Sequence, residues 1–252
     1  MNNTVKSEII ERYKSAANRL ILLDYDGTLV NLTAIPHTAV LPEHMEDIIL
    51  KMVSTRQTTL FIITGRGHED IDIFLNHIPV NIIAEHGAMM KNEGVWKKQL
   101  INNYSWKKEI IPVLNIITSA CPNSYVEEKN YSLTWHYRNA DTDLGYASSR
   151  ELIRHLNSVI HAHNLKILDG NKVVEILTND IGKGKAVEKL FEHNKYDFVL
   201  SIGDDATDEE MFGFFLNHPE AVTIKVGEGA TQARFILKNI GEVATLLNHM
   251  TE

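Results

Sequence analysis

The chain has 252 residues, 44% of them hydrophobic and 23% charged, so it is long enough for one large domain or for a core with a smaller partner. A net charge of -8 without a basic run argues against nucleic acid and anionic membranes as partners. The single cysteine excludes an internal disulfide and a multi-cysteine metal site. No signal peptide or membrane span is recognisable, so we expect a cytoplasmic protein.

Short apolar runs alternate with helical patterns in the first third of the chain. The runs at 20–26, 58–66 and 80–88 predict strands, and helices are expected near 42–52 and 69–75. This alternation indicates a parallel sheet with crossover helices.

The same alternation resumes near residue 183. The expected elements are a helix at 183–191, a strand at 196–205, a helix near 208–215, a strand at 220–227 and a last helix near 242–249. Together the two stretches predict an α/β core, a Rossmann-like doubly wound parallel sheet.

The segment between these stretches has a different pattern. It predicts a helix at 106–119, strands at 124–129 and 131–138, a helix at 144–163, and strands at 165–169 and 172–178. The order helix, strand, strand occurs twice (αββαββ), which favours a small antiparallel sheet with helices on one face. We therefore predict a core formed by 1–95 and 178–252, with an α+β cap domain inserted at 96–177.

Four of the predicted core strands end in polar residues. The endings are Asp24-Tyr25-Asp26, Thr64-Gly65-Arg66, Glu85-His86 and Gly203-Asp204-Asp205. In a parallel sheet these endings meet at one edge, where ligands of open α/β sheets bind. This convergence is the main sequence evidence for an active site.

Asp24 and Asp26 suit covalent catalysis. Gly27 lets the backbone turn after them, so that one acid can serve as a nucleophile and the other as an acid and base. Asp204 and Asp208 bring two more acids to the same edge, and such a group is costly unless a cation neutralises it. An all-oxygen set with room for water indicates Mg²⁺.

Two further residues suit an anionic substrate. Thr64 offers a neutral donor at a strand end, and Lys183 offers a positive charge at the start of a helix. Both also have a simpler interpretation: Thr64 could be only a hydroxyl at a strand end, and Lys183 only a solvated lysine. Asp204 or Asp208 could likewise only cap the helix that follows. Lys185, two residues further on, competes with Lys183 for the same role.

The motifs resemble those of the haloacid-dehalogenase-like phosphatases in order and spacing, over nearly the whole chain. They are DYDGT at 24–28, Thr64 after its strand, Lys183 before its helix and GDDATD at 203–208. The resemblance implies that Asp24 attacks phosphorus and forms an aspartyl-phosphate. It also implies that Asp26 protonates the leaving oxygen and then activates water.

The same resemblance implies a magnesium site and a choice of lysine. The implied ligands are Asp24, Asp204 and the carbonyl of Asp26, with Asp208 behind them or acting through a water. The resemblance favours Lys183 over Lys185, because Lys-Gly before a helix matches the family pattern.

The position of the insert narrows the resemblance. Only 39 residues separate Asp24 from Thr64, whereas 118 separate Thr64 from Lys183, so the cap enters after the second motif, as in the C2-type sugar-phosphate phosphatases. The strings AEHGA, EEKNYSLTWHYR, GNKVVE and GDDATDEEMF are similar to those of the trehalose-6-phosphate phosphatases. This resemblance implies hydrolysis of trehalose 6-phosphate to trehalose and phosphate.

The resemblance also suggests which residues bind the sugar. The cap candidates are Glu127, Lys129, Arg138, Lys172 and Glu175, and the core candidates are Arg66, Glu85 and His86. Charged groups on alternate positions of a strand can donate to and accept from sugar hydroxyls, although they could equally form cross-strand ion pairs. Glu85 and His86 could likewise only cap their strand.

Two other functions stay open. The chain could hydrolyse another sugar phosphate, such as a sucrose or mannosylglycerate phosphate, because only the cap selects the sugar. It could also be a silent paralogue that binds a sugar phosphate or a synthase, but the intact Asp24, Asp26, Lys183 and Asp204 argue against this. We expect a monomer, and any association with a trehalose-6-phosphate synthase would be non-covalent.

Overall fold

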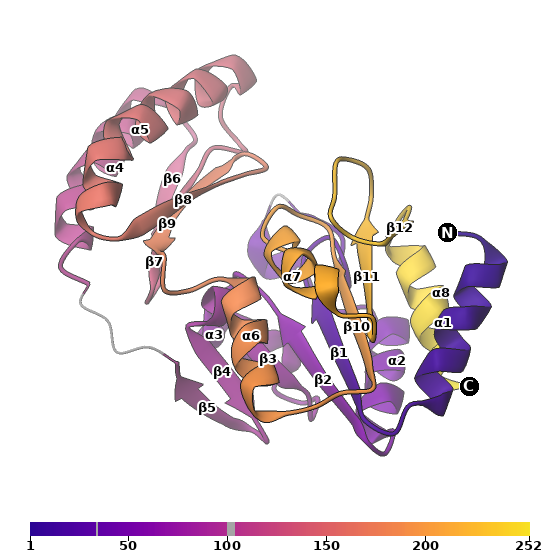
Figure 1. Ribbon diagram of the computed structural model, residues 1–252. Coiled ribbons are helices and arrows are strands. Elements are labelled where there is room, and N and C mark those ends of the chain that lie inside the picture. The colour runs from indigo at the N-terminus through magenta and orange to yellow at the C-terminus, as the bar shows by residue number, and fades with distance from the viewer. Residues whose placement is uncertain (34, 100–103) are drawn as a thin grey trace. The chain divides into compact units, whose positions relative to one another are not determined.

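The computed structural model describes residues 1–33, 35–99 and 104–252, which form two compact units (Figure 1). The core unit comprises Met1–Gln99 and Gly182–Glu252, and the inserted unit comprises Leu100–Ile181. Positions 100–103, which the predicted cap domain includes, lie outside the described residues.

The core unit is built on one mixed sheet with the strand order β12-β11-β10-β1-β2-β3-β4-β5. Its strands are β1 (Arg19–Asp24), β2 (Thr58–Ile63), β3 (Asn81–Ala84), β4 (Met89–Asn92), β5 (Val95–Lys98), β10 (Phe198–Gly203), β11 (Ala221–Val226) and β12 (Phe235–Leu237). From β12 to β3 all neighbours are parallel, and β4 and β5 add an antiparallel hairpin at one edge. The predicted α/β fold with a doubly wound sheet is confirmed.

The strand order reverses at the centre of the sheet. From β1 the chain moves outward through β2 and β3, and after the inserted unit it returns to β10 on the other side of β1 and moves outward to β11. Such a reversal leaves a crevice at the carboxyl ends of the two central strands. The ends of β1 and β10 are therefore the expected place for a ligand.

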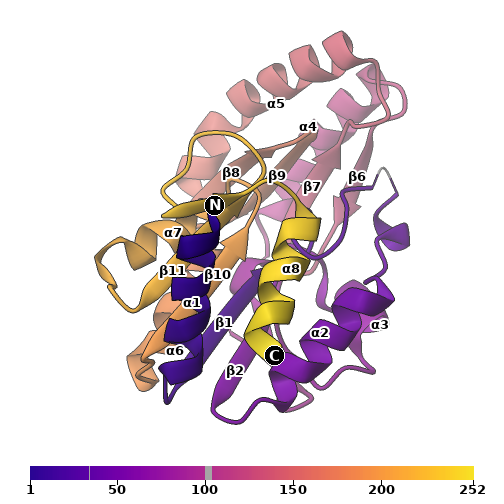
Figure 2. The same cartoon turned by 90° about the vertical axis from the view of Figure 1, so that its right-hand side faces the viewer.

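Helices cover both faces of the sheet. They are α1 (Asn3–Ser15), α2 (Glu43–Ser54), α3 (His68–Leu75), α6 (Lys183–His193), α7 (Glu209–Phe214) and α8 (Ile240–Thr251). Helices α1, α2 and α8 pack together on one face, and α6 and α7 pack together on the other (Figures 1 and 2). Along α2, Met45, Ile48, Ile49 and Met52 share one stripe and are all buried, as their spacing predicts.

The central strand is a rigid support because it is buried on both faces. Leu20, Ile21, Leu22 and Leu23 of β1 have no exposed surface. Burying each such side chain stabilises the fold by about 1.5–3 kcal/mol. The strand therefore holds the residue that ends it, Asp24, in a fixed position.

One helix and three strands of the core unit are absent from the sequence prediction: α1, the strands β4 and β5 of the hairpin, and β12. The hairpin turns at Glu93 and Gly94, whose positive φ values of 49° and 78° suit a tight turn between short strands. Strand β5 (VWKK) is mostly exposed, and its two apolar residues are too few to predict a strand. In the described part of the chain, no helix combines the length and apolarity that a membrane span requires.

The inserted unit has the predicted α+β order. It contains α4 (Lys107–Ala120), β6 (Tyr125–Glu128), β7 (Ser132–His136), α5 (Thr142–Ala162), β8 (Leu165–Gly170) and β9 (Val173–Thr178). The four strands form an antiparallel sheet in the order β6-β7-β9-β8.

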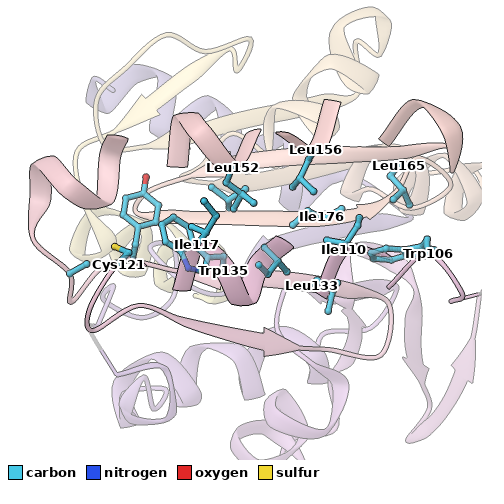
Figure 3. Packing of buried hydrophobic residues seen from close by; sticks show 14 residues of the cluster. Trp106, Ile110, Ile117, Cys121, Leu133, Trp135, Leu152, Leu156, Leu165 and Ile176 are labelled. Carbon is cyan, nitrogen blue, oxygen red and sulfur yellow. The ribbon is translucent and has the colours of Figure 1, made fainter. Parts of the chain in front are cut away.

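Alternation along these strands gives the small sheet two different faces. Leu133, Trp135 and Ile176 pack against Ile110 and Leu152 of the two helices (Figure 3). Because successive strand residues point to opposite faces, the residues between them lie on the face away from the helices. That second face carries the charged residues described below.

Candidate active site

Asp24 and Asp204 meet at the ends of the two central strands. Asp24 ends β1 and is only 4% exposed, and Asp204 follows β10 directly. Gly27 has a φ of 86°, and a Cβ atom at this position would lie 2.1 Å from Asp204 Oδ2. Glycine is thus required both for the left-handed turn and for the space that the Asp204 carboxylate occupies.

Lys183 joins two acids in the interior of the core unit. Its Nζ donates to Asp24 Oδ1 at 2.7 Å and to Asp208 Oδ1 at 2.8 Å. The lysine is the first residue of α6 and is 2% exposed, whereas Lys185 is exposed. Of the two lysines that the sequence left open, Lys183 is therefore the one that lies among the acids.

Asp208 holds the loop that carries Asp204. It is fully buried, and its Oδ2 accepts from the backbone amides of Asp204 at 3.0 Å and Asp205 at 3.1 Å. A Cβ atom on Gly203 would lie 2.1 Å from Asp208 Cγ, so the carboxylate packs directly on the glycine backbone. The motif GDDATD thus forms one compact, hydrogen-bonded loop.

The acids at this site repel one another. Burial, with the charges of Asp204 and Asp205, raises the pKa of Asp24 from 3.8 to about 8 against the opposing effect of Lys183. Burial and the charges of Asp205 and Asp208 raise the pKa of Asp204 to about 7. Additional positive charge would therefore stabilise the ionised acids.

The acids fit a divalent cation. Asp24, Asp204 and Asp208 each offer a carboxylate oxygen within 4.8 Å of the others. Among the described residues, none forms a hydrogen bond with the buried Asp24 Oδ2. A buried carboxylate oxygen without a donor is costly, and a hard cation such as Mg²⁺ would satisfy it. Because the oxygens of Asp208 accept from Lys183 and two amides, Asp24 and Asp204 are better suited to direct contact.

The Asp26 carboxylate is bound by Arg66. Nε and Nη2 of the arginine each donate to one oxygen of Asp26 at 2.7 Å, and Nη1 donates to the Pro36 carbonyl at 2.9 Å. The guanidinium also lies over the ring of Tyr25, 5.5 Å from its centroid. This two-point pairing fixes the orientation of Asp26. A metal contact through the carbonyl of Asp26 stays a prediction.

The end of β2 is held by the end of β3. The amide of His86 donates to the carbonyl of Thr64 at 3.1 Å, and the amide of Glu85 donates to the carbonyl of Arg66 at 3.0 Å. Glu85 and His86 have φ values of 49° and 54°, a strained pair of the kind found at functional sites. Thr64 Oγ1 accepts the Arg66 amide at 3.1 Å, which is compatible with donation of its own hydrogen to a ligand.

Five residues form what we call the polar face of the inserted unit: Glu127, Lys129, Thr134, His136 and Glu175. Glu127 of β6 pairs in register with Thr134 of β7, which pairs with Glu175 of β9. His136 Nε2 lies 2.6 Å from Glu127 Oε2, and Lys129 Nζ lies 3.2 Å from Glu175 Oε1. Glu127, Lys129 and Glu175, all predicted sugar-binding residues, thus lie together on this face.

The other two predicted residues of the inserted unit lie near the turn between β8 and β9. Arg138 Nη2 donates to the Asn171 carbonyl at 2.7 Å, and Lys172 Nζ donates to Thr142 Oγ1 at 3.3 Å. Lys172 has a φ of 61°, which the tight turn requires. Their assignment to substrate binding stays a prediction.

Three residues at these sites were assigned no role from the sequence: Asp205, Lys225 and Thr134. Burial would raise the pKa of Asp205, but Lys183 and hydrogen bonds from Thr207 and Asp208 lower it to about 2. Lys225 stands out only as a charge inside the apolar strand AVTIKV. In the described part of the chain, no hydrogen-bond partner reaches the buried Thr134 Oγ1.

The doubly wound sheet and the inserted α+β unit define a haloacid-dehalogenase-like fold. The fold is shared with a haloacid dehalogenase-like hydrolase from B. subtilis, with a TM-score of 0.64 over 91% of this chain and 99% of that one, at 16% identity. At this identity the likeness concerns the fold alone.

The chain belongs to the trehalose-phosphatase family, whose sequence model matches residues 22–240. Its structure is similar to that of the C. albicans trehalose-6-phosphate phosphatase C-terminal domain, with a TM-score of 0.93, 28% identity, and coverage of 98% of this chain and 96% of that one. The family places the chain among the phosphoric monoester hydrolases.

Curated relatives match almost the whole chain but are much longer. The chain is 36% identical to the bifunctional trehalose-6-phosphate synthase/phosphatase of Thermoproteus tenax, over 94% of this chain and 32% of that protein. It is 31% identical to the trehalose-phosphatase of Zygosaccharomyces rouxii, over 85% of this chain and 26% of that protein. The chain thus spans about a third or less of these relatives.

Proposed function

We propose that this chain hydrolyses trehalose 6-phosphate to trehalose and phosphate through an aspartyl-phosphate on Asp24. The observation that carries the proposal is the buried contact of Lys183 with Asp24 and Asp208, at 2.7 and 2.8 Å. A lysine buried beside a nucleophilic carboxylate can neutralise the charge of an incoming phosphate. A protein that only packs its core gains little from burying this set of charges.

In the first step, a carboxylate oxygen of Asp24 attacks phosphorus. The new bond joins that oxygen to phosphorus, and the bond from phosphorus to the 6-oxygen of the glucose unit breaks. Asp26 gives its proton to the departing oxygen, which leaves as a trehalose hydroxyl. Lys183 stabilises the negative charge on the phosphoryl oxygens, and the Thr64 hydroxyl donates a hydrogen bond to one of them.

In the second step, water attacks the aspartyl-phosphate. The Asp26 carboxylate takes a proton from the water as the new oxygen–phosphorus bond forms, and the bond between phosphorus and the Asp24 oxygen breaks. Inorganic phosphate leaves, and Asp24 returns to its starting form. The two hydrogen bonds from Arg66 support this role because they hold the Asp26 carboxylate in one orientation.

We propose that Mg²⁺ is bound by Asp24 and Asp204, with the carbonyl of Asp26 as a third ligand and Asp208 behind them. A bound Mg²⁺ neutralises phosphoryl charge and allows two anions to approach each other. The support is the donor set itself, in which three carboxylate oxygens lie within 4.8 Å of one another.

We propose that the polar face recognises the sugar. Its paired acids and bases, Glu127 with His136 and Glu175 with Lys129, can accept from and donate to hydroxyl groups in fixed directions. Arg138, Lys172, Glu85 and His86 are further candidates. Trehalose 6-phosphate is favoured over a sucrose or mannosylglycerate phosphate by the names of the relatives, which refer to trehalose phosphate.

A silent, regulatory role is the second candidate. The C-terminal domain of a Candida albicans trehalose synthase regulatory protein has the same fold, with a TM-score of 0.79 at 18% identity. The fold alone is therefore compatible with both roles. The complete set of Asp24, Asp26, Lys183 and Asp204 supports the catalytic one.

The proposed setting is the cytoplasm, with the chain acting as a monomer. The relative that carries both a synthase and a phosphatase name supports an association with a trehalose-6-phosphate synthase.

A panel of sugar phosphates tests the function. Phosphate release would be measured with Mg²⁺ for trehalose 6-phosphate, sucrose 6-phosphate, mannosylglycerate phosphate and glucose 6-phosphate. We expect the highest kcat/KM for trehalose 6-phosphate, and loss of turnover in EDTA with recovery on adding Mg²⁺. A higher value for another sugar would overturn the substrate, and no turnover with any member would favour the silent role.

A further inference from the structure

Lys225 is a buried charge for which the proposed reaction has no direct use. It lies in β11 (Ala221–Val226), every residue of which is buried, and it is itself 6% exposed. Removing an ammonium group from water is costly unless strong partners compensate it. A lysine at this position therefore requires a partner nearby.

That partner is the backbone of the loop GDDATD, which carries Asp204. Lys225 is opposite Gly203 in the parallel pairing of β10 and β11, and its Nζ donates to the carbonyl of Asp204 at 2.7 Å. A hydrogen bond from a charged donor is stronger than one between neutral groups. Lys225 thus reaches past the strand end and contacts the peptide that follows Asp204.

This peptide unit is held at both of its polar atoms. Its carbonyl oxygen, from Asp204, accepts from Lys225, and its amide, from Asp205, donates to Asp208 Oδ2 at 3.1 Å. Two hydrogen bonds of opposite direction fix the plane of the peptide. The Cα atom that carries the Asp204 side chain belongs to the same plane, so its position is fixed as well.

We propose that Lys225 is a positioning residue for the Mg²⁺ ligand Asp204. It acts through the backbone carbonyl and makes no contact with the metal. The inference rests on the proposed function, because it presupposes that Asp204 binds Mg²⁺. Groups that orient metal ligands in this way typically change metal affinity by about 10–100-fold when they are removed.

If Lys225 acted only through its charge, its removal would change the Mg²⁺ affinity in the opposite direction. Lys225 adds one positive charge beside the acids. Removing it makes the site one unit more negative, which attracts a divalent cation more strongly. The sign of the change in Mg²⁺ affinity therefore separates positioning from simple charge compensation.

The test is calorimetric titration of MgCl₂ into metal-free protein at pH 7.5. We expect Lys225→Met to raise the Mg²⁺ Kd about 10–100-fold. Lys225→Gln keeps a donor that reaches one bond less far, so its Kd should lie between those of the wild type and Lys225→Met. At saturating Mg²⁺ the activity of both variants should recover, which a merely structural defect would not allow.

Lys91 provides the matched control. It is also a buried lysine of a core strand, 8% exposed, but its Nζ contacts Asp72, which is not among the acids of the proposed site. Lys91→Met should destabilise the fold without changing the Mg²⁺ Kd. Circular dichroism would confirm that each variant is folded.

The outcomes distinguish the two proposals. If the wild type does not bind Mg²⁺, the proposed metal site is wrong. If the wild type binds and Lys225→Met binds equally well or more tightly, only the positioning role is wrong. Should Lys225→Met fail to fold, a Lys225→Gln Kd at or below that of the wild type overturns the role.

Discussion

The acids around Lys183 and the polar face of the inserted unit use the same residue types in different surroundings. Around Lys183 the side chains of Asp24 and Asp208 are at most 6% exposed, whereas on the polar face those of Glu127 and His136 are 33% and 20% exposed. Breaking a fully buried ion pair costs about 3–5 kcal/mol, and the contribution of a pair falls toward about 1 kcal/mol or less as solvent reaches it.

The difference suits the two tasks of the phosphatase that we propose. Phosphoryl transfer needs charges that do not move, because misplacement of the reacting atoms by about 1 Å can cost 100-fold in rate. Sugar recognition needs groups that can exchange an internal partner for a hydroxyl. We therefore expect changes near Lys183 to abolish the chemistry for every substrate, and changes on the polar face to alter only the choice of substrate.

The largest expected effect is that of Asp24→Asn. The amide is a poor nucleophile, so kcat should fall by about 10⁴-fold or more for every phosphate ester. In metal-free protein at pH 8 the same change should raise the melting temperature, because it removes a carboxylate that burial disfavours while Lys183 keeps Asp208 as its partner. Phosphate release and thermal unfolding give the two measurements. Retained turnover would show that Asp24 is not the nucleophile.

Lys183→Met should damage both stability and activity. The change leaves Asp24 and Asp208 buried without their shared partner, at an expected cost of about 3–5 kcal/mol in the free energy of unfolding. Denaturant unfolding measures this cost. Lys185→Met is the matched control, two residues away on the same helix but exposed, and it should change stability by about 0.5 kcal/mol or less. Equal effects of both changes would contradict the assignment of Lys183.

The strand ends explain why much of the core site could be predicted from sequence. Apolar runs reveal buried parallel strands, and parallel strands bring their carboxyl ends to one edge, so the order of residues along the chain is enough to group Asp24, Thr64 and Asp204. The role of Lys225 was not predicted because it depends on which strand lies next to β10. The local sequence does not indicate that β11 is that neighbour.

Contacts between side chains are even harder to predict from the sequence. The residue type of Arg66 suggested substrate binding, but its two hydrogen bonds to Asp26 depend on a turn at Gly27 and a loop near Pro36. Thr134 was overlooked because a threonine within an apolar strand has no distinctive pattern. Only the register of β6, β7 and β9 reveals that it lies between Glu127 and Glu175.

Glu175→Gln should have a smaller and more selective effect. Glu175 accepts from Ser132 Oγ at 2.5 Å and from Lys129 Nζ at 3.2 Å, and the change removes its charge while keeping its shape. We expect KM for trehalose 6-phosphate to rise about 10–100-fold, since hydrogen bonds to charged groups contribute about 1.5–3 kcal/mol. The kcat/KM for p-nitrophenyl phosphate, which has no sugar, should stay unchanged.

Glu128→Gln is the control for that experiment. Glu128 is the neighbour of Glu127 on β6, so it points to the other side of the strand, and its side chain is 56% exposed in a pair with Lys107. Both kinetic constants should match those of the wild type. An equal loss of activity toward both substrates in Glu175→Gln would show that the polar face affects the chemistry and not only the choice of sugar.

The last expected effect is the pH dependence of stability in metal-free protein. The pKa of Asp24 is about 8 and that of Asp204 about 7 in the folded chain, against an ordinary value of 3.8. Between about pH 4 and pH 8 the folded chain therefore holds more protons at these sites than the unfolded chain. The contribution of these two groups to the free energy of unfolding then falls as pH rises.

Other carboxylates have the opposite slope, so the informative quantity is the difference between the wild type and Asp24→Asn. Glu127 is one example: burial would raise its pKa, but His136 and Lys129 lower it below its usual value. In EDTA, the melting temperature of the wild type should fall relative to that of Asp24→Asn from pH 5 to pH 8. Each kcal/mol corresponds to about 2–4 °C in a chain of this size.

Saturating Mg²⁺ should reduce this difference in melting temperature between the wild type and Asp24→Asn, because a cation favours the ionised acid. A difference that is equally large with and without Mg²⁺ would mean that the metal does not bind beside Asp24.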